Sequence, residues 1–325
     1  MTSRKRQPGS QRLAEADIAA LSPEGRGVAH VDGQTVFVWG ALPGERVLFR
    51  PLRRRRGIVE AEVVEVLQPS PDRIEPACRH FGVCGGCSLQ HVSPQRQRRL
   101  KSDMLRTQFE RIGKVEPEEW LPPLHGEAWG YRRKARLGVK LVAKKGGVLV
   151  GFRERSSSLI APLERCEVLD PRVGHILPQL AELVEGLSVP RQLPQIEVAI
   201  GDNAVGLVFR HLAPLTHGDH EKLATFGRQH GFQIYLQPGD ESTVHLLWPE
   251  QGELTYRLPD FDVELAFRPT DFTQVNAEIN RLMVSRAVEL LDPQPQEAVL
   301  DLFCGLGNFT LPLARRAARA VGVEI

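Results

Sequence analysis

The feature that most restricts the fold is a short apolar run that leads into a glycine-rich turn near residue 300. Residues 298–303 have the pattern of a buried strand, and Gly305 and Gly307 follow in the turn. A helix over about 308–319 and a second strand over 320–325 complete the pattern. This order forms the first unit of an open α/β sheet, in which ligands bind beyond the carboxyl ends of the strands. The pattern predicts a Rossmann-like domain in the last part of the chain.

The same turn indicates the kind of ligand. A pyrophosphate-binding turn reads GxGxxG or ends in GK[ST], and this turn does neither. Glu324 ends the second strand, where an acidic side chain typically accepts hydrogen bonds from ribose hydroxyls. Gly305 and Gly307 allow a ligand to approach the backbone closely. The sequence therefore favours an adenosine-bearing ligand without a pyrophosphate.

Three of the five cysteines, Cys78, Cys84 and Cys87, lie within one short segment. The N-terminal residues carry no apolar export signal, and such clustering in an unexported chain indicates a metal rather than disulfides. A three-cysteine site needs a fourth ligand, and Cys166 is the best candidate. The thiols alone fit either zinc or a four-iron cluster. The spacing favours the cluster, because structural zinc sites more often use paired CxxC motifs.

Residues 12–70 contain short alternating runs broken by turn signals, among them the hairpin signal Asp32-Gly33. They predict a small OB-like β-barrel, preceded by a disordered basic tail over 1–11. Residues 1–115 carry 20 Lys or Arg against 12 Asp or Glu, whereas the remainder carries 22 against 28. This polarity indicates a polyanionic partner, although solvated basic faces would give the same counts. We expect Arg53, Arg54, Arg55 and Arg56, in a loop between two strands, to contact phosphates.

The rest of the chain is predicted to mix helices and strands. Apolar residues recur at helical spacing over 94–115, and residues 139–142 and 148–152 form a hairpin across two glycines. Further helices are predicted over 173–187 and 276–291. In an extended strand, Arg132, Lys134 and Arg136 share one face, where they would contact phosphates or form a solvated surface.

Three motifs together carry a family resemblance. They are C-x5-C-G-G-C over 78–87, the F-x-Q-x-N segment over 272–276, and the DLFCGLGNF turn over 301–309. In combination they resemble the RNA uracil-C5 methyltransferases, in particular those that modify bacterial 23S ribosomal RNA. The resemblance spans essentially the whole chain. It implies a multidomain α/β plus β protein that uses S-adenosylmethionine and a [4Fe-4S] cluster.

The resemblance also implies a division into domains. Residues 12–70 would be a TRAM domain, an OB-like RNA-binding barrel. Residues 71–93 and 125–267 would form a central α+β domain with the iron–sulfur site. Residues 94–124 would provide a helix that packs on the methyltransferase domain, of which 268–325 would be the N-terminal part.

Site residues follow from the resemblance by position. It implies cluster ligands at Cys78, Cys84, Cys87 and Cys166. Phe272 would be structural or would contact RNA. Phe303 could also be a core residue, and Asn308 a helix N-cap. The implied contacts to S-adenosylmethionine are Gln274, Phe303, Asn308 and Glu324.

The family's chemistry uses a cysteine thiolate that attacks uracil C6, so that C5 becomes nucleophilic and takes the methyl group before a base removes the C5 proton. In the family, this cysteine and base belong to motifs beyond the position of Glu324. We therefore expect the chain as given to be incomplete and inactive, with Cys304 a packing residue. We expect a cytoplasmic monomer that binds 23S rRNA and no membrane. The alternative is a non-catalytic RNA-binding module with an iron–sulfur or zinc site.

Overall fold

The computed structural model describes residues 12–55 and 57–325, although not the side chain of Arg55. The predicted basic tail, residues 1–11, and Arg56 lie outside the described residues. The chain divides into two compact units, Met1–Pro123 and Leu124–Ile325. Among the described residues, no helix combines the length and the apolar character that crossing a bilayer requires.

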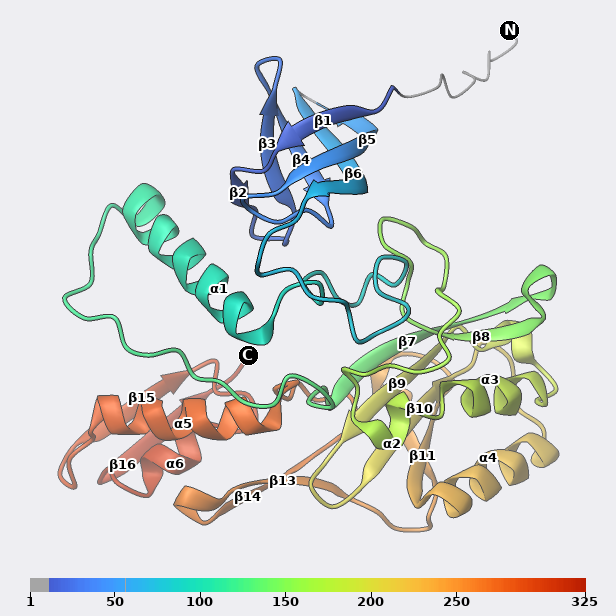
Figure 1. Cartoon of the computed structure of the whole chain (residues 1–325). Coiled ribbons are helices and arrows are strands. Elements are labelled where there is room, and N and C mark those ends of the chain that lie inside the picture. Colours follow the sequence, from blue (N-terminus) through green and yellow to red (C-terminus); the bar gives the residue numbers. More distant parts are fainter. Residues whose placement is uncertain (1–11, 56) are drawn as a thin grey trace, which may run out of the picture. The chain divides into compact units, whose positions relative to one another are not determined.

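The first unit contains a six-stranded sheet in the order β1-β5-β6-β4-β3-β2, which curls around a single apolar core (Figure 1). Val38, Val47 and Ala61 lie in this core with no exposed surface. Asp32 and Gly33 both have positive φ, as a tight hairpin turn needs, so the predicted hairpin is confirmed. The strands are β1 (Ala14–Asp17), β2 (Ala20–Leu21), β3 (Gly27–Val31), β4 (Gln34–Trp39), β5 (Arg46–Arg55) and β6 (Ile58–Gln68).

The predicted helix after the cysteine segment is confirmed as α1 (Pro94–Gln108), which continues in a π-helical turn over Phe109–Gly113. Ser93 caps its start by accepting a hydrogen bond from the backbone N–H of Arg96 at 3.3 Å. Leu100 is buried against the barrel unit, whereas Ile112 is exposed. The predicted contact of this helix with the methyltransferase domain stays a prediction.

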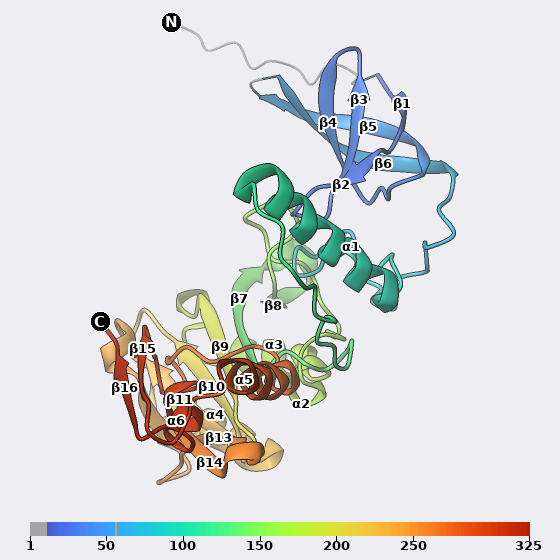
Figure 2. The same ribbon diagram turned by 90° about the vertical axis from the view of Figure 1, so that its left-hand side faces the viewer.

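The second unit is built on a six-stranded sheet in the order β12-β11-β10-β9-β7-β8. Two helices, α3 and α4, pack on it, and Figures 1 and 2 show both beside the strands. The hairpin predicted across Gly146 and Gly147 is confirmed as β7–β8. The strands are β7 (Lys134–Val142), β8 (Gly147–Gly151), β9 (Gln195–Ile200), β10 (Val205–Arg210), β11 (Phe232–Gln237) and β12 (His245–Trp248). The helices are α2 (Pro171–Gly174), α3 (Leu177–Glu185) and α4 (His217–His230), with short 3-10 turns at Ala143–Lys145, Pro190–Gln192, Glu241–Thr243 and Pro259–Phe261.

The last part of the unit combines an antiparallel hairpin with a parallel strand pair. Val284, Val288 and Leu313 on the helices share one core with Leu258 and Leu265 of the hairpin. The segment that we assigned to the central domain up to residue 267 therefore packs with the residues that follow it. The elements are β13 (Leu254–Leu258), β14 (Val263–Phe267), α5 (Ala277–Leu291), β15 (Ala298–Leu302), α6 (Thr310–Ala314) and β16 (Arg319–Val323).

Two predicted helices differ from the structure. The single helix expected over 173–187 is split into α2 and α3. The split follows from Pro178, which lacks an N–H and whose ring would clash with a helical carbonyl four residues earlier. The helix expected over 308–319 is only the short α6, and Pro312 lies in its first turn, where proline is tolerated.

One buried carboxylate fixes the start of α4. Asp219 accepts hydrogen bonds from the Thr216 backbone N–H at 2.9 Å, from the Thr216 hydroxyl at 2.8 Å and from the Ser188 backbone N–H at 2.8 Å. Burial by itself would raise the pKa of Asp219, but the hydrogen bonds from Ser188 and Thr216 outweigh it and hold the pKa well below its ordinary value. The ionised carboxylate therefore stabilises the fold.

We predict that Asp219→Asn lowers the free energy of unfolding at pH 7 by about 1–3 kcal/mol. Because the folded pKa lies below the unfolded value of about 3.9, the contribution is complete above that pH and is lost progressively as the pH falls from there toward the folded pKa. Urea unfolding should thus show a smaller difference from wild type at pH 3 than at pH 7. Glu221→Gln, on the exposed side of the same helix, is the control and should change little. An equal loss at both pH values would contradict a role for the ionised form.

Candidate functional site

The candidate site lies at the carboxyl ends of β15 and β16. The two strands are parallel and pair from Ala298 with Arg319 to Leu302 with Val323, so their carboxyl ends lie together. Glu324 follows β16, and its Oε2 accepts a hydrogen bond from the backbone N–H of Gly305 at 2.7 Å. The structure therefore brings the predicted acidic residue to the glycine turn.

Phe303 occupies an unusual position in this turn. Its φ is +62°, a left-handed conformation that costs a residue with a Cβ about 1–2 kcal/mol. Its side chain is 75% exposed, so the ring is not part of the apolar core. Strained, exposed residues that a fold nevertheless retains concentrate at functional sites. The strand end and the turn thus present Phe303 to solvent at the position where a ligand of an α/β sheet binds.

Asn308 does not cap the following helix. Helix α6 begins at Thr310, and its N-cap residue is Phe309. The Asn308 carboxamide instead pairs with that of Asn280 on α5 through two hydrogen bonds, each 2.9 Å long. Its Oδ1 also accepts a hydrogen bond from the Tyr256 hydroxyl at 3.2 Å. Asn308 is therefore held by α5 and β13.

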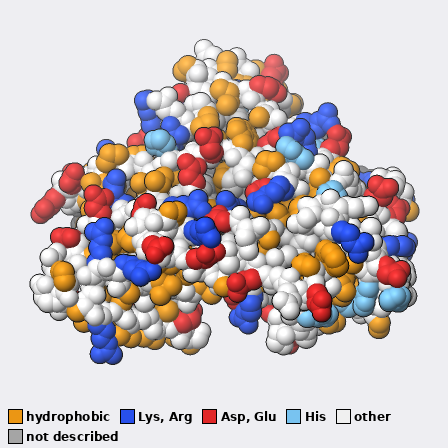
Figure 3. Space-filling view, turned by 90° about the horizontal axis from the view of Figure 1, so that it is seen from below, with side chains coloured by type: hydrophobic (Ala, Val, Ile, Leu, Met, Phe, Trp, Pro, Cys, Tyr) orange, Lys and Arg blue, Asp and Glu red, His pale blue; other side chains and the backbone are white. Residues whose placement is uncertain are grey.

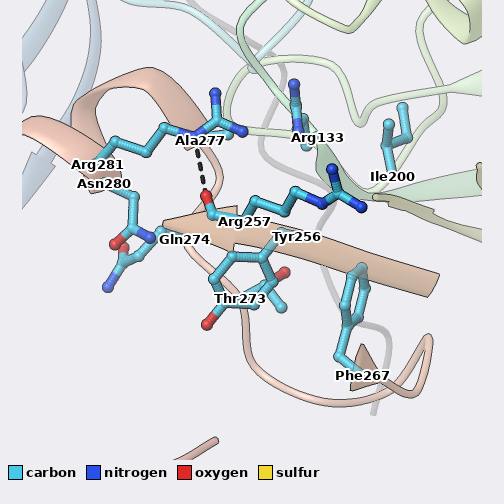
Figure 4. Close-up of a pocket in the computed structure, with 10 residues that line it drawn as sticks. All are labelled: Arg133, Ile200, Tyr256, Arg257, Phe267, Thr273, Gln274, Ala277, Asn280 and Arg281. Carbon is cyan, nitrogen blue, oxygen red and sulfur yellow. Dashed lines mark hydrogen bonds between the residues drawn. The ribbon is translucent and has the colours of Figure 1, made fainter. Parts of the chain in front are cut away.

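The fourth predicted cofactor residue, Gln274, lies in the segment before α5. With Asn280 and Tyr256 it lines a small pocket of about 20 Å³ (Figure 4). Asn280 and Tyr256 bond Asn308, so Gln274 and Asn308 are linked through the wall of this pocket. The other lining residues are Arg133, Ile200, Arg257, Phe267, Thr273, Ala277 and Arg281.

The arginines of the pocket are held by one acid, Asp202, in the turn between β9 and β10. Asp202 bonds the guanidinium of Arg133, and its Oδ2 accepts from Arg281 at 2.7 Å and from the Arg257 backbone N–H at 2.8 Å. The Arg281 Nε donates to the Arg257 carbonyl at 3.0 Å, the dashed line in Figure 4. Burial would raise the pKa of Asp202, but the hydrogen bond from Arg133 and its charge outweigh burial and lower it.

The residues predicted to share one face of a strand differ in their surroundings. The Lys134 ammonium donates to the carbonyl oxygens of Pro269 and Asp271 and lies 3.5 Å from Glu197. Burial lowers the pKa of Lys134, and Glu197 offsets this only in part. Lys134 thus holds the 269–271 loop, a structural role that the sequence did not indicate. Arg136 is exposed and lies 3.5 Å from Glu197, and Arg132 precedes β7.

The loop predicted around Arg53–Arg56 is wrong for its first three residues. Arg53, Arg54 and Arg55 belong to β5, which pairs with β6 as far as Arg55 and Ile58. Arg53 is exposed and bonds Glu60 across the pair at 3.1 Å. Successive side chains of a strand point to opposite faces, so Arg53 and Arg54 do not form one cluster. On the face in Figure 3, basic side chains are likewise interspersed with acidic ones.

Phe272 is 80% exposed in the segment that connects β14 to α5. Lys134 holds the carbonyl of the preceding residue, Asp271, at 2.8 Å. Asp271 also accepts hydrogen bonds from the Arg268 backbone and guanidinium. The exposed ring therefore stands on an anchored backbone, and it contributes little to the core.

The predicted cluster ligands are divided between the units. Cys78, Cys84 and Cys87 lie in the first unit and Cys166 in the second, and no disulfide joins any of the five cysteines. The backbone N–H of Gly86 lies 3.4 Å from the Cys84 sulfur, a hydrogen bond of the kind that tunes iron–sulfur clusters. Among the described residues, no three His, Cys, Asp or Glu side chains converge on one metal position.

Cys304 packs against β16. A Cβ placed on Gly322 would lie 2.8 Å from the Cys304 sulfur, so glycine at this position makes room for the thiol. This contact supports the interpretation of Cys304 as a packing residue in the turn.

Comparisons with known proteins identify the family. The family described as tRNA (Uracil-5-)-methyltransferase matches residues 172–325, and the TRAM domain matches residues 12–64. The 23S rRNA (uracil(1939)-C(5))-methyltransferase RlmD of Nitrosococcus oceani is 60% identical over 322 residues, which are 98% of this chain and 72% of that protein. The chain belongs to the RlmD family.

Other RlmD proteins show similar relationships. That of Alkalilimnicola ehrlichii is 60% identical over 311 residues, covering 95% of this chain and 70% of the relative. That of Alcanivorax borkumensis is 53% identical over 325 residues, covering 99% and 73%. Members of this family are S-adenosylmethionine-dependent uracil-C5 methyltransferases of rRNA, so the predicted enzyme class is confirmed. The barrel β1–β6 is the TRAM domain of this RlmD-type chain.

A solved structure supports the fold. The Pyrococcus abyssi tRNA (uracil-54, C5)-methyltransferase in complex with S-adenosyl-L-homocysteine matches with a TM-score of 0.62 at 21% identity, covering 93% of this chain and 70% of that one. At this identity the likeness concerns the fold alone.

Sequence reasoning missed three residues of this candidate site, Asp202, Tyr256 and Asn280. Asn280 was one polar residue in an amphipathic helix, and its burial could have been suspected from the apolar Val284 and Val288 at helical spacing. No local signal pairs Asp202 with Arg133, because 69 residues separate them.

We predict that Phe303→Gly leaves the free energy of unfolding unchanged or raises it by up to about 1 kcal/mol, because glycine adopts a positive φ without strain. The same change should weaken S-adenosylhomocysteine binding. Thermal unfolding and equilibrium dialysis measure the two effects. Phe309→Ala, at a partly buried position packed on the core, is the control and should destabilise the chain. A loss of more than about 1 kcal/mol in Phe303→Gly would show instead that the ring packs on the fold.

Proposed function

We propose that this protein transfers the methyl group of S-adenosylmethionine to C5 of a uridine in 23S rRNA, at position 1939 as in the relatives' names. The observation that carries the proposal is the site at the carboxyl ends of β15 and β16, where Phe303 and Glu324 meet a glycine turn. The residues of this site lie in a chain of which 98% aligns with the RlmD of Nitrosococcus oceani at 60% identity.

The residues of this site fit the cofactor. The Glu324 carboxylate uses one oxygen on Gly305, and a carboxylate has further acceptor positions for ribose hydroxyls. Phe303 offers an exposed aromatic face, and Asn308 and Gln274 offer carboxamides. When bound, S-adenosylmethionine supplies an electrophilic methyl group. The chain's own residues bind and orient the cofactor.

RNA would contact both units. In the TRAM domain we propose Arg53, Arg54, Arg55 and Arg56 as phosphate contacts. In the second unit we propose Arg132, Lys134, Arg136 and Phe272, of which Arg136 and Phe272 are exposed. Lys134 would act through the loop that it holds. A uridine must leave its stack before its C5 can be reached, and an exposed aromatic ring can stack on an unpaired base. We expect a monomer in the cytoplasm.

We propose neither the nucleophilic cysteine nor the base among residues 1–325. Within these residues, Cys304 is the cysteine that lies in the glycine turn, but its thiol packs against Gly322. The other four are the proposed cluster ligands Cys78, Cys84, Cys87 and Cys166.

The function is tested with the 325-residue chain and RNA. We expect at least about 10-fold tighter binding to a 23S rRNA fragment that contains uridine 1939 than to a length-matched fragment without it, since specific contacts add to the electrostatic affinity. Filter binding at fixed salt measures this ratio. A 5-fluorouridine version of the fragment should form no covalent adduct with the chain, because attack at C6 needs the nucleophile. Equal affinity for both fragments would contradict the function, and an adduct lost in Cys304→Ala would contradict the placement of the nucleophile.

We also propose that Cys78, Cys84, Cys87 and Cys166 hold a [4Fe-4S] cluster. The donor chemistry fits, because all four are thiols without disulfides and the Cys84 sulfur already accepts an N–H. Three of them lie on one loop, and the cluster would need these sulfurs to gather around it.

Anaerobically purified protein should contain about four irons and absorb broadly at visible wavelengths, as [4Fe-4S] proteins do. Cys84→Ser and Cys166→Ser should reduce the iron content to a similar extent, because each removes one of four ligands. Cys304→Ser is the matched control and should retain iron. One tightly bound zinc without iron or sulfide would contradict the cluster, and full iron content in Cys166→Ser would exclude this residue as a ligand.

A further inference from the structure

A buried polar residue on α5 has no part in the function proposed so far. Asn280 is 5% exposed and lies on the face of α5 that carries the buried Val284 and Val288. A buried carboxamide is costly unless its donors and acceptor are satisfied, and an apolar residue would avoid that cost. Asn308 supplies a partner for one Asn280 donor and for its acceptor, since Asn280 donates to it and accepts from it at 2.9 Å. Asn280 therefore forms its hydrogen bonds with the glycine turn, and an apolar residue at this position would form none.

The reciprocal pair fixes which way the Asn308 carboxamide faces. Its oxygen accepts from Asn280 and, at 3.2 Å, from the Tyr256 hydroxyl, so both acceptor positions are used. The Tyr256 hydroxyl donates this bond, and burial raises its pKa to about 12, so the hydroxyl stays protonated. A flipped carboxamide would place its NH₂ against the Asn280 NH₂ and against the Tyr256 proton. The flipped orientation is therefore disfavoured.

This arrangement leaves one donor available. The Asn308 NH₂ carries two hydrogens, and one of them is used on Asn280. The second makes no hydrogen bond to the residues that the structure describes. Asn308 is partly exposed in the turn that precedes α6, and Glu324 bonds the same turn at Gly305.

We propose that Asn280 and Tyr256 are positioning residues, which orient the Asn308 carboxamide so that its remaining N–H meets a hydrogen-bond acceptor of S-adenosylmethionine. This inference rests on the proposed function for the identity of the ligand. Asn280 also lines the pocket with Gln274 (Figure 4). Through Asn280, α5 therefore connects the two proposed cofactor contacts Gln274 and Asn308.

The test compares Asn280→Leu with Val284→Ala. Leucine keeps the branched heavy-atom skeleton of Asn280 but removes both hydrogen bonds. Val284→Ala removes a fully buried methyl pair one turn further along the same face and leaves the carboxamides intact. We expect Asn280→Leu to weaken S-adenosylhomocysteine binding about 10-fold, as the loss of an oriented hydrogen bond does, and Tyr256→Phe to weaken it less. Val284→Ala should keep the wild-type affinity at a temperature where it is folded.

Two further measurements separate positioning from packing. In a double-mutant cycle on affinity, Asn280→Leu should have little effect once Asn308 is alanine, because it acts through that residue. Amide hydrogen exchange over 303–309 should be faster in Asn280→Leu than in Val284→Ala, with or without ligand.

Additive effects of Asn280→Leu and Asn308→Ala would overturn the inference, as would exchange no faster than in Val284→Ala. If the wild-type chain bound no S-adenosylhomocysteine, the proposed cofactor contact of Asn308 would fail. The exchange measurement would then still decide whether Asn280 orders the turn.

Discussion

The candidate site depends on the carboxylate of Asp202. It joins three elements that are far apart in the sequence, through Arg133 before β7, Arg257 in β13 and Arg281 in α5. Two guanidinium groups would repel each other in this partly buried position without an acid between them. The ionised Asp202 thus keeps the central sheet, the β13–β14 hairpin and α5 in one arrangement, and the pocket that contains Gln274 lies between them.

From α5 the arrangement extends to the glycine turn by two kinds of contact. Val284 and Val288 pack with Leu313 of α6 in an apolar core, which sets the distance between the helices but not the orientation of any polar group. Asn280 supplies the orientation through its pair with Asn308. The left-handed backbone of Phe303 is tolerated in a turn that is held from both sides, by this pair and by the Glu324 carboxylate.

Much of the local structure could be predicted from the sequence, because the signals are local. Alternating apolar residues and Asp32-Gly33 predicted the barrel strands and their hairpin. Helical spacing predicted α1 and α5, and the apolar run before Gly305 predicted β15 and the turn. The motif combination indicated the family, which the RlmD relatives confirm. The cofactor residues were assigned from that resemblance, and the cysteine site and the basic residues were first indicated by spacing and charge. All of these assignments stay predictions.

The sequence by itself determined most of the elements, the turn and the family, since periodicity, glycine and motif spacing are properties of short segments. Only the tertiary structure decided the partners of the charged and buried polar side chains. Lys134 binds carbonyls 135 and 137 residues away, and Asp202 binds an arginine 79 residues away. The tertiary structure also decided that the hairpin over 254–267 packs in one core with α5 and α6. Side chains choose partners by proximity in the folded chain, and no local pattern records which distant residue will be near.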